Sequence, residues 1–271
     1  MIILTAANAD TAKDDFGRIY KGFSYKGVIR QTIKKAETFG YTPVVYDLGS
    51  LGIGEPFRID DETLLEKGYY KREIKKGYKS KSLFKPDLVK LCLSMYNDLI
   101  VYLDGDAQLW GNIDEIATED YDVGVTLRDP SEFESAWYRE HFEIVRFVNA
   151  GVIFFRPTLV TRKFVDTWQK MTQKLGNDQK ALNRLTSPDE YPEPNSVHMI
   201  DGVRIKYFPC AQYNFYYFDK ALEPNIKIMH FKGTVRNFYP FDWKKRIYCI
   251  IAIPIFNKIR FLIKKIISNS E

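Results

Sequence analysis

The sequence predicts an α/β domain in which a mixed, mostly parallel sheet is covered by helices. Short apolar runs that indicate buried strands alternate with segments of helical periodicity along most of the chain. The 271 residues, 45% hydrophobic and 15% aromatic, suffice for one large domain and argue against disorder. We expect a catalytic domain at residues 1–243 and a basic amphipathic tail at residues 244–271.

The expected elements follow the chain in order. The first half should contain a strand at residues 1–5, a helix at 26–39, a strand at 42–46, a helix at 86–95 and a strand at 99–103. Residues 49–81 show no sustained periodicity and indicate a long connection. The second half should contain strands at 123–127, 151–155, 203–208 and 226–229, with helices at 158–174 and 178–185.

Two aspartates follow the apolar run LIVYL at residues 99–103, namely Asp104 and Asp106, with Gly105 between them. Ligands of such sheets bind beyond the carboxyl ends of the strands, where this pair should lie. Two carboxylates at this spacing can bind a divalent metal, and Gly105 lets a ligand approach the backbone closely. Such a metal suits a diphosphate leaving group because it neutralises the charge that develops there. The alternative for the motif alone is a solvated turn.

The composition restricts the possible kinds of site and the cellular compartment. Cys92, Cys210 and Cys249 lack the spacing of a disulfide framework or a zinc site and favour a reducing compartment. The amino terminus, MIILTAANAD, has no basic region and reads as a strand, so we expect a cytoplasmic protein. The net charge of +5 includes a basic stretch between Lys67 and Lys85, which is either a solvated face or a surface for anions.

Four segments in order, LIVYLDGDAQLWGNIDEI, NAGVIFFRP, NDQKALN and MHFKG, resemble the GT-A glycosyltransferases, particularly family 8. The resemblance extends from residue 3 to about residue 243, although HFKG continues as TVRNFYPF rather than with the Lys-Pro-Trp frequent in that family. It implies a Rossmann-like fold and transfer of a hexose, with retention, from a nucleotide-sugar such as a UDP-sugar. The implied acceptor is a glycan or glycolipid of surface polysaccharide or lipopolysaccharide synthesis.

The same resemblance implies site residues. Asp104 and Asp106 match the metal-binding pair, and His230 matches the histidine that completes the site. We expect Mn²⁺, or Mg²⁺, because imidazole favours transition metals over Ca²⁺. The resemblance places the donor against Thr5, Ala6, Ala7, Asn8, Lys85, Asp87, Asp104, Gly105, Ala150, Gly151, Lys232 and Gly233. It places Asn149, Asp178 and Gln179 at the reaction centre.

Several of these residues also have an ordinary structural explanation. His230 alone could be a hydrogen-bonded core histidine, as we expect for His141 and His198. Thr5 and its neighbours could simply end a strand. Lys85 could be solvent-exposed, Asp87 could be a favourable charge at a helix amino terminus, and Asp178 could be a helix cap.

Two other classes of function remain as alternatives. A phosphohydrolase of the haloacid dehalogenase type also carries Asp-x-Asp after a buried strand, but normally after the first one. A non-enzymatic adaptor could instead use its basic stretches to bind a membrane or nucleic acid, although neither stretch matches a nucleic-acid module. We therefore expect no nucleic-acid partner.

The tail combines apolar and basic side chains. Residues 248–267, YCIIAIPIFNKIRFLIKKII, contain too many charges for a confident membrane span and are interrupted at Pro254. The excess of Lys and Arg favours binding to an anionic membrane surface, so the enzyme would be peripheral on the inner face of the cell membrane. The alternative is a helix packed on the domain or on another subunit.

Overall fold

The structure is a computed structural model that describes residues 1–7, 22–47, 56–57, 84–134, 136–142, 146–216 and 225–239. Asn8, most of the long connection at 49–81 and the whole tail at 244–271 lie outside the described residues. Within the described part of the chain, every helix is too short or too polar to cross a bilayer.

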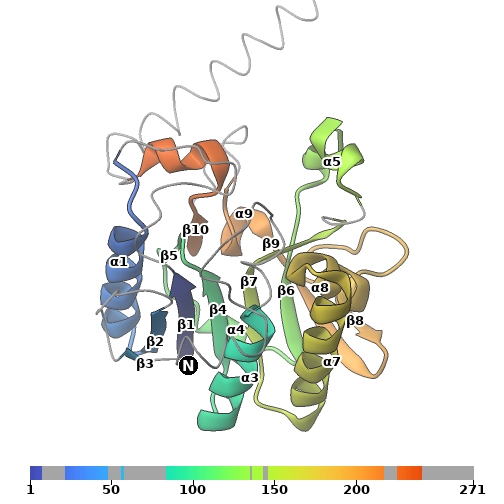
Figure 1. The fold of residues 1–271 in the computed structure, drawn as a ribbon, viewed down its shortest axis with the longest axis horizontal. Helices are drawn as coiled ribbons and strands as arrows, with labels where there is room; N and C mark the ends of the chain where they lie inside the picture. The colour runs from blue at the N-terminus through green and yellow to red at the C-terminus, as the bar shows by residue number, and fades with distance from the viewer. Residues whose placement is uncertain are drawn as a thin grey trace, which may run out of the picture.

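A central sheet of eight strands organises the domain (Figure 1). Its order is β3-β2-β1-β4-β7-β6-β9-β8. The first four strands run parallel, as do β6 and β9, whereas β7 is antiparallel to both β4 and β6, and β8 is antiparallel to β9. The bounds are β1 Ile2–Ala7, β2 Thr42–Asp47, β3 Pro56–Phe57, β4 Ile100–Asp104, β6 Val123–Leu127, β7 Val148–Phe155, β8 Val197–Ile200 and β9 Val203–Pro209. The predicted mixed, mostly parallel α/β sheet is confirmed.

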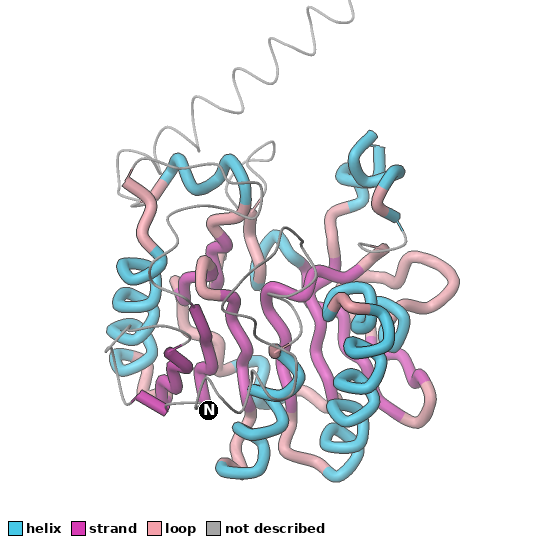
Figure 2. Tube along the Cα trace, viewed as in Figure 1, coloured by secondary structure: helices cyan, strands magenta, loops and turns pink. Residues whose placement is uncertain are grey.

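Helices lie around the sheet (Figure 2). Their bounds are α1 Tyr25–Thr38, α3 Lys85–Met95, α4 Glu115–Thr118, α5 Ala136–Glu140, α7 Leu159–Leu175, α8 Asp178–Thr186 and α9 Cys210–Tyr213. Two short 3₁₀ turns, η1 Pro130–Glu134 and η2 Gly233–Phe238, complete the described helical elements.

The strands divide their side chains between two apolar layers, because successive residues of a strand point to opposite faces. Ile100 and Tyr102 of β4 join the layer formed with α3, α7 and α8. Val101 and Leu103 join the opposite layer, which includes residues of α1 and α4. Burial on both faces explains why LIVYL is continuously apolar rather than alternating.

The junction between α7 and α8 positions residues that matter for the site. Gly176, with φ of +66°, ends α7 in the left-handed conformation that glycine adopts readily. Asn177 then caps α8, because its side chain accepts a hydrogen bond from the backbone N–H of Lys180. The cap is therefore Asn177 rather than Asp178, whose carboxylate is left for other contacts.

A separate two-stranded ribbon was not predicted as such. It pairs β5, Ala107–Leu109, with β10, Ile228–His230, in antiparallel register. The sequence predicted the later strand, at 226–229, but neither β5 nor the edge strand β8. β5 has only three residues, which are buried but too few to show a periodic pattern, and the half-exposed β8 shows no run of buried side chains.

Asp122, directly before β6, makes stability depend on pH. Its carboxylate accepts hydrogen bonds from the backbone N–H of Arg204 at 3.1 Å and from Arg204 Nε at 3.0 Å. Burial raises the pKa of Asp122, but these hydrogen bonds outweigh that effect and hold the pKa below its ordinary value. The ionised carboxylate therefore stabilises the fold above the unfolded-state pKa of about 3.9, and this contribution is lost as the pH falls through the lower folded-state pKa.

We expect Asp122→Asn to lower the free energy of unfolding at pH 7 by about 1–3 kcal/mol, because charged hydrogen bonds are lost. The difference from the wild type should shrink below about pH 4, where the unfolded carboxyl is protonated. Urea unfolding across this pH range measures both effects. A difference that did not change with pH would contradict the ionic origin of the contribution.

Candidate active site

The two aspartates lie at the carboxyl end of a central strand. Asp104 is the last residue of β4 and pairs in register with Ala6 of β1. Gly105 and Asp106 form the turn that leads into β5, and both are buried. The strand end and the turn thus place both carboxylates at the edge of the sheet where ligands of such folds bind.

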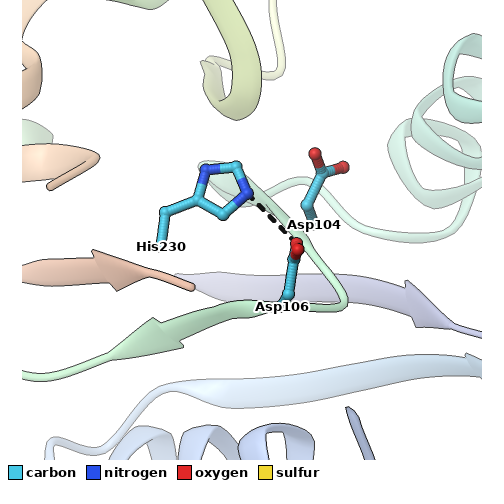
Figure 3. A group of neighbouring side chains, drawn as sticks. All are labelled: Asp104, Asp106 and His230. Carbon is cyan, nitrogen blue, oxygen red and sulfur yellow. Dashed lines mark hydrogen bonds and ion pairs between the residues drawn. The ribbon is translucent and has the colours of Figure 1, made fainter. Parts of the chain in front are cut away.

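His230 reaches the same place through the β5–β10 ribbon. It pairs with Ala107, the residue after Asp106, and the backbone N–H of Phe231 donates to the carbonyl oxygen of Asp106 at 2.8 Å. One ligand atom each from Asp104, Asp106 and His230 lie within 4.8 Å of one another (Figure 3). We call these three residues the Asp–Asp–His cluster.

The donor set of the cluster fits a divalent metal. Two carboxylates and one imidazole match the ligands that Mn²⁺ accepts, and Mg²⁺ also binds carboxylates. His230 Nε2 is 3.1 Å from Asp106 Oδ1, so this ring nitrogen and this carboxylate oxygen face each other (Figure 3). His230 and Asp106 are almost fully buried, which reduces competition from water.

A buried arginine contacts the cluster and was not predicted. One terminal nitrogen of Arg236, in η2, donates to Asp106 Oδ2 at 2.6 Å and to the hydroxyl of Tyr25 at 2.9 Å. The guanidinium also lies over the rings of Phe23 and Tyr25. Burial alone raises the pKa of Asp106, but the charge of His230 in its protonated form and the guanidinium of Arg236 outweigh it and hold this pKa far below its ordinary value. Asp106 is therefore ionised at neutral pH and available as a ligand.

Lys85, in the first turn of α3, links the cluster to α8. Its ammonium is 2.8 Å from Asp104 Oδ1, 2.9 Å from Asp178 Oδ2 and 3.2 Å from the carbonyl oxygen of Ala150. Burial lowers the pKa of Lys85, but the two carboxylates outweigh it and keep the pKa well above its usual value. Burial raises the pKa of Asp178, and Lys85 offsets part of that shift. The lysine thus remains charged and bridges two carboxylates of the predicted site.

An irregularity in β7 brings the Asn-Ala-Gly segment to the same region. The register with β6 shifts between Val125 and Thr126, so Thr126 pairs with Asn149 while Val125 pairs with Ile153. Asn149 Oδ1 accepts from the backbone N–H of Gly151 at 2.8 Å. Asn149 Nδ2 is buried and has no hydrogen-bond partner among the described residues, so a donor group there remains available.

The side-chain amide of Gln179 is oriented by two hydrogen-bond donors. Its side-chain oxygen lies 3.4 Å from a terminal nitrogen of Arg128 and 3.5 Å from the backbone nitrogen of Ala150. Because both partners can only donate, Oε1 faces them and the amide nitrogen points elsewhere. Arg128 itself is fully buried and contacts Glu132 at 3.0 Å and the hydroxyl of Tyr216 at 3.1 Å. Arg128, Glu132 and Tyr216 were not predicted as part of the site.

Lys232 lies beside this arginine. Its ammonium is 5.2 Å from the centre of the Tyr216 ring. Burial, and then the charge of Arg128, lower the pKa of Lys232 to about 8. Gly233 follows with φ of +55°, a conformation that favours glycine, and begins η2.

The other residues predicted to bind the nucleotide-sugar differ in their contacts. Thr5 is buried in β1, and within the described part of the chain its hydroxyl has no hydrogen-bond partner. Ala6 and Ala7 end β1, whereas Asn8 is outside the described residues. Asp87 accepts a hydrogen bond from Gln169 of α7, so the structure shows it in a helix–helix contact. The donor roles of these residues stay predictions.

Because Gly151 has no side chain, the imidazole of His230 can pack against its backbone. A Cβ atom at Gly151 would lie 2.4 Å from Cε1 and 2.7 Å from Nδ1 of His230. We expect Gly151→Ala to displace the imidazole, to cost about 1–3 kcal/mol through overpacking, and to weaken Mn²⁺ binding at least tenfold. Calorimetric titration with Mn²⁺ measures the second effect.

Gly124→Ala is the matched control for that substitution. Its added Cβ would lie 2.6 Å from Phe208 and 3.0 Å from Phe154, so it overpacks the core without touching His230. This variant should lose comparable stability and retain Mn²⁺ binding. Equal losses of Mn²⁺ binding in the two variants would show that the effect is not specific to His230.

The family of the chain is defined by its sequence. Residues 66–237 match the family model of the nucleotide-diphospho-sugar transferases. Because this match includes more than half of the chain, the protein belongs to that family and is a glycosyltransferase of the GT-A type. The predicted enzyme class is confirmed, whereas the narrower assignment to family 8 stays a prediction.

Solved structures that the chain resembles include three glycosyltransferases. One, involved in glycosylation of the major capsid of PBCV-1, is 12% identical, with coverage of 87% of this chain and 97% of that chain and a TM-score of 0.48. The galactosyltransferase LgtC, in complex with donor and acceptor sugar analogs, is 14% identical, with coverages of 86% and 88% and a TM-score of 0.49. GlyE of Streptococcus pneumoniae TIGR4 is 16% identical, with coverages of 86% and 55% and a TM-score of 0.39. No curated protein sequence matches the chain.

Proposed function

We propose that the protein transfers a hexose from a nucleotide-sugar, with UDP as its nucleotide, to a glycan or glycolipid acceptor in a metal-dependent reaction. The observation that carries this proposal is the Asp–Asp–His cluster at the carboxyl end of β4, in a chain of the nucleotide-diphospho-sugar transferase family. The surroundings of the cluster supply both cations and carboxylates, as binding of a diphosphate and a sugar requires.

In this proposal Asp104, Asp106 and His230 hold Mn²⁺, or Mg²⁺. The metal, when bound, neutralises charge on the departing diphosphate. Lys232, whose charge interacts with those of Asp104 and Asp106, and Gly233 bind the diphosphate. The nucleoside lies against the end of β1, at Thr5, Ala6, Ala7 and Asn8.

The sugar is proposed to lie between the β7 irregularity and the start of α8. Asn149 supplies its buried amide nitrogen, Ala150 and Gly151 line the pocket, and Asp178 and Gln179 bind sugar hydroxyls. Lys85 positions Asp178 through their ion pair, and Asp87 completes the donor contacts at the start of α3. Family membership disfavours the phosphohydrolase alternative. Retention of anomeric configuration remains part of the proposal because the resemblance to family 8 implies it.

Release of nucleoside diphosphate tests the proposed reaction. The protein is incubated with UDP-, GDP- and CDP-hexoses, with and without Mn²⁺, and UDP release that needs Mn²⁺ is expected. Hydrolysis of p-nitrophenyl phosphate without cleavage of any nucleotide-sugar would support the phosphohydrolase instead. Proton NMR of the glycoside formed from an acceptor sugar distinguishes retention from inversion.

We further propose that residues 1–243 form the catalytic domain and that residues 244–271 bind the anionic inner face of the cell membrane. Their excess of Lys and Arg among apolar residues supports this, and it suits an acceptor used in surface polysaccharide or lipopolysaccharide synthesis. Truncation after Ile247 should abolish binding to anionic liposomes while donor hydrolysis continues. Liposome binding that survives truncation would contradict the proposed role of the tail.

A further inference from the structure

A chain of buried hydrogen bonds leads from the β7 irregularity to His230. Where the β6–β7 register shifts, the carbonyl oxygens of Asn149 and Val152 lie 3.0 Å and 3.3 Å from Thr126 Oγ1. Thr126 Oγ1 is in turn 2.7 Å from Asn214 Nδ2. Asn214 Oδ1 is 2.8 Å from His230 Nδ1. Thr126 and Asn214 are completely buried and His230 nearly so, which shields these groups from water.

The direction of each hydrogen bond is fixed by the carbonyl groups. A carbonyl oxygen can only accept, so the single hydroxyl proton of Thr126 is donated to one of them. Thr126 Oγ1 must then accept from Asn214, which requires the amide nitrogen of Asn214 to face it. The amide oxygen therefore faces His230, and only an Nδ1–H can donate to it.

This direction determines what His230 presents to the cluster. With the proton on Nδ1, the neutral imidazole has a lone pair on Nε2. That lone pair faces Asp106 Oδ1 at 3.1 Å, so two acceptors face each other in a buried place. A cation bound by both atoms relieves this repulsion, whereas an Nε2–H would occupy the ligand position with a proton.

We propose that Asn214, held by Thr126, is a positioning residue that fixes the tautomer of His230 and thereby keeps Nε2 available to a divalent cation. The inference rests on the proposed metal site and deepens it. Partners that hold the second nitrogen of a metal-binding histidine typically change metal affinity by about 10–100-fold when they are lost. Asn214→Leu should therefore weaken Mn²⁺ binding by about that factor.

The tautomer itself can be measured without metal, donor or activity. Long-range ¹H–¹⁵N NMR of the metal-free protein, recorded at a pH at which the imidazole is neutral, locates the imidazole proton. The chain has three histidines, so a spectrum of His230→Gln identifies the signals of His230. We expect Nδ1–H in the wild type, and an Nε2–H population in Asn214→Leu and in the nearly isosteric Thr126→Val.

Two further variants separate positioning from stability. Asn214→Asp keeps an acceptor for Nδ1–H and should retain the tautomer and Mn²⁺ affinity within a few-fold. Asn183→Ala removes another buried asparagine, which bonds to the backbone of Val148, and should cost stability without changing the tautomer of His230. Thermal unfolding of all variants shows which of them are folded under the conditions of measurement.

A wild-type His230 protonated on Nε2 would overturn the inference, as would an Asn214→Leu protein with unchanged tautomer and unchanged Mn²⁺ affinity. If the proposed function is wrong, the same measurements give a different result. In that case the wild type shows Nδ1–H but neither binds Mn²⁺ nor releases nucleoside diphosphate from any nucleotide-sugar.

Discussion

Asp106→Asn is expected to lower kcat/KM for metal-dependent release of nucleoside diphosphate by about 10³-fold, which corresponds to about 4 kcal/mol of transition-state stabilisation. The substitution preserves shape but removes the negative charge that faces His230 and Arg236. A neutral amide is a poor ligand for Mn²⁺ and leaves the buried arginine beside the cluster without its carboxylate. Initial rates of UDP release from a UDP-hexose at saturating Mn²⁺ measure the loss.

The control for this prediction is Asp98→Asn. Asp98 is a largely exposed aspartate that pairs only weakly with the amino terminus, at 3.8 Å, and it is remote from the cluster in the fold. Its variant should retain wild-type kcat/KM. A kcat/KM for Asp106→Asn within tenfold of the wild type, in a folded protein, would show that the cluster is not required for turnover.

Arg128→Met is expected to lower the free energy of unfolding by about 3–5 kcal/mol, because it removes one partner of a buried ion pair. Arg128 is 1% exposed and Glu132 is also largely buried, so loss of the guanidinium leaves a carboxylate in a poorly solvated place. The hydroxyl of Tyr216 donates to Glu132 at 2.6 Å and would not replace the missing positive charge. Urea unfolding at neutral pH measures the change.

Two controls identify the origin of that loss. Arg128→Met combined with Glu132→Gln should recover part of the stability, because no unpaired charge then remains. Lys90→Met breaks the half-exposed pair with Asp166 and should cost no more than about 1 kcal/mol. Equal losses for Arg128→Met and for the double variant would indicate that lost packing, rather than the buried charge, dominates.

The sequence predicted those parts of the fold that continuous apolar runs define. The strand expected at residues 123–127 is β6 with the same ends, and the helices expected at 158–174 and 178–185 differ from α7 and α8 by one residue at each changed end. These segments are long or fully buried, so their side-chain pattern follows the geometry of the backbone directly. The Asp104–Asp106 pair was found because it follows such a run.

Other parts of the site depend on pairing between distant segments. His230 meets Asp106 only because β10 pairs with β5, and three residues of β5 carry no periodic signal. From residues alone, His230 could equally be a core histidine, and only the family resemblance indicated the metal site. Arg236 and Asn214 are single polar residues in short turns, without spacing that predicts their contacts.

Unlike His230, Arg236 and Asn214, Arg128 has a position in the sequence that indicates a place in the site. It follows the buried run at 123–127 directly, as Asp104 follows the run at 99–103. The rule that polar residues after buried strands lie at the ligand-binding edge applies to both positions. We expected only carboxylates at this edge, so the arginine that orients Gln179 was not predicted.

Metal-dependent binding of a nucleoside diphosphate tests the proposed site most directly. UDP, GDP and CDP are titrated calorimetrically into the wild type and into Asp106→Ala, each with and without Mn²⁺. We expect UDP to bind the wild type in the presence of Mn²⁺, and to lose most of its affinity when Mn²⁺ is omitted or Asp106 is removed. Nucleotide binding that is the same with and without Mn²⁺ in both proteins, or absent from both, would contradict the assignment of the Asp–Asp–His cluster as a metal site for a nucleotide-sugar.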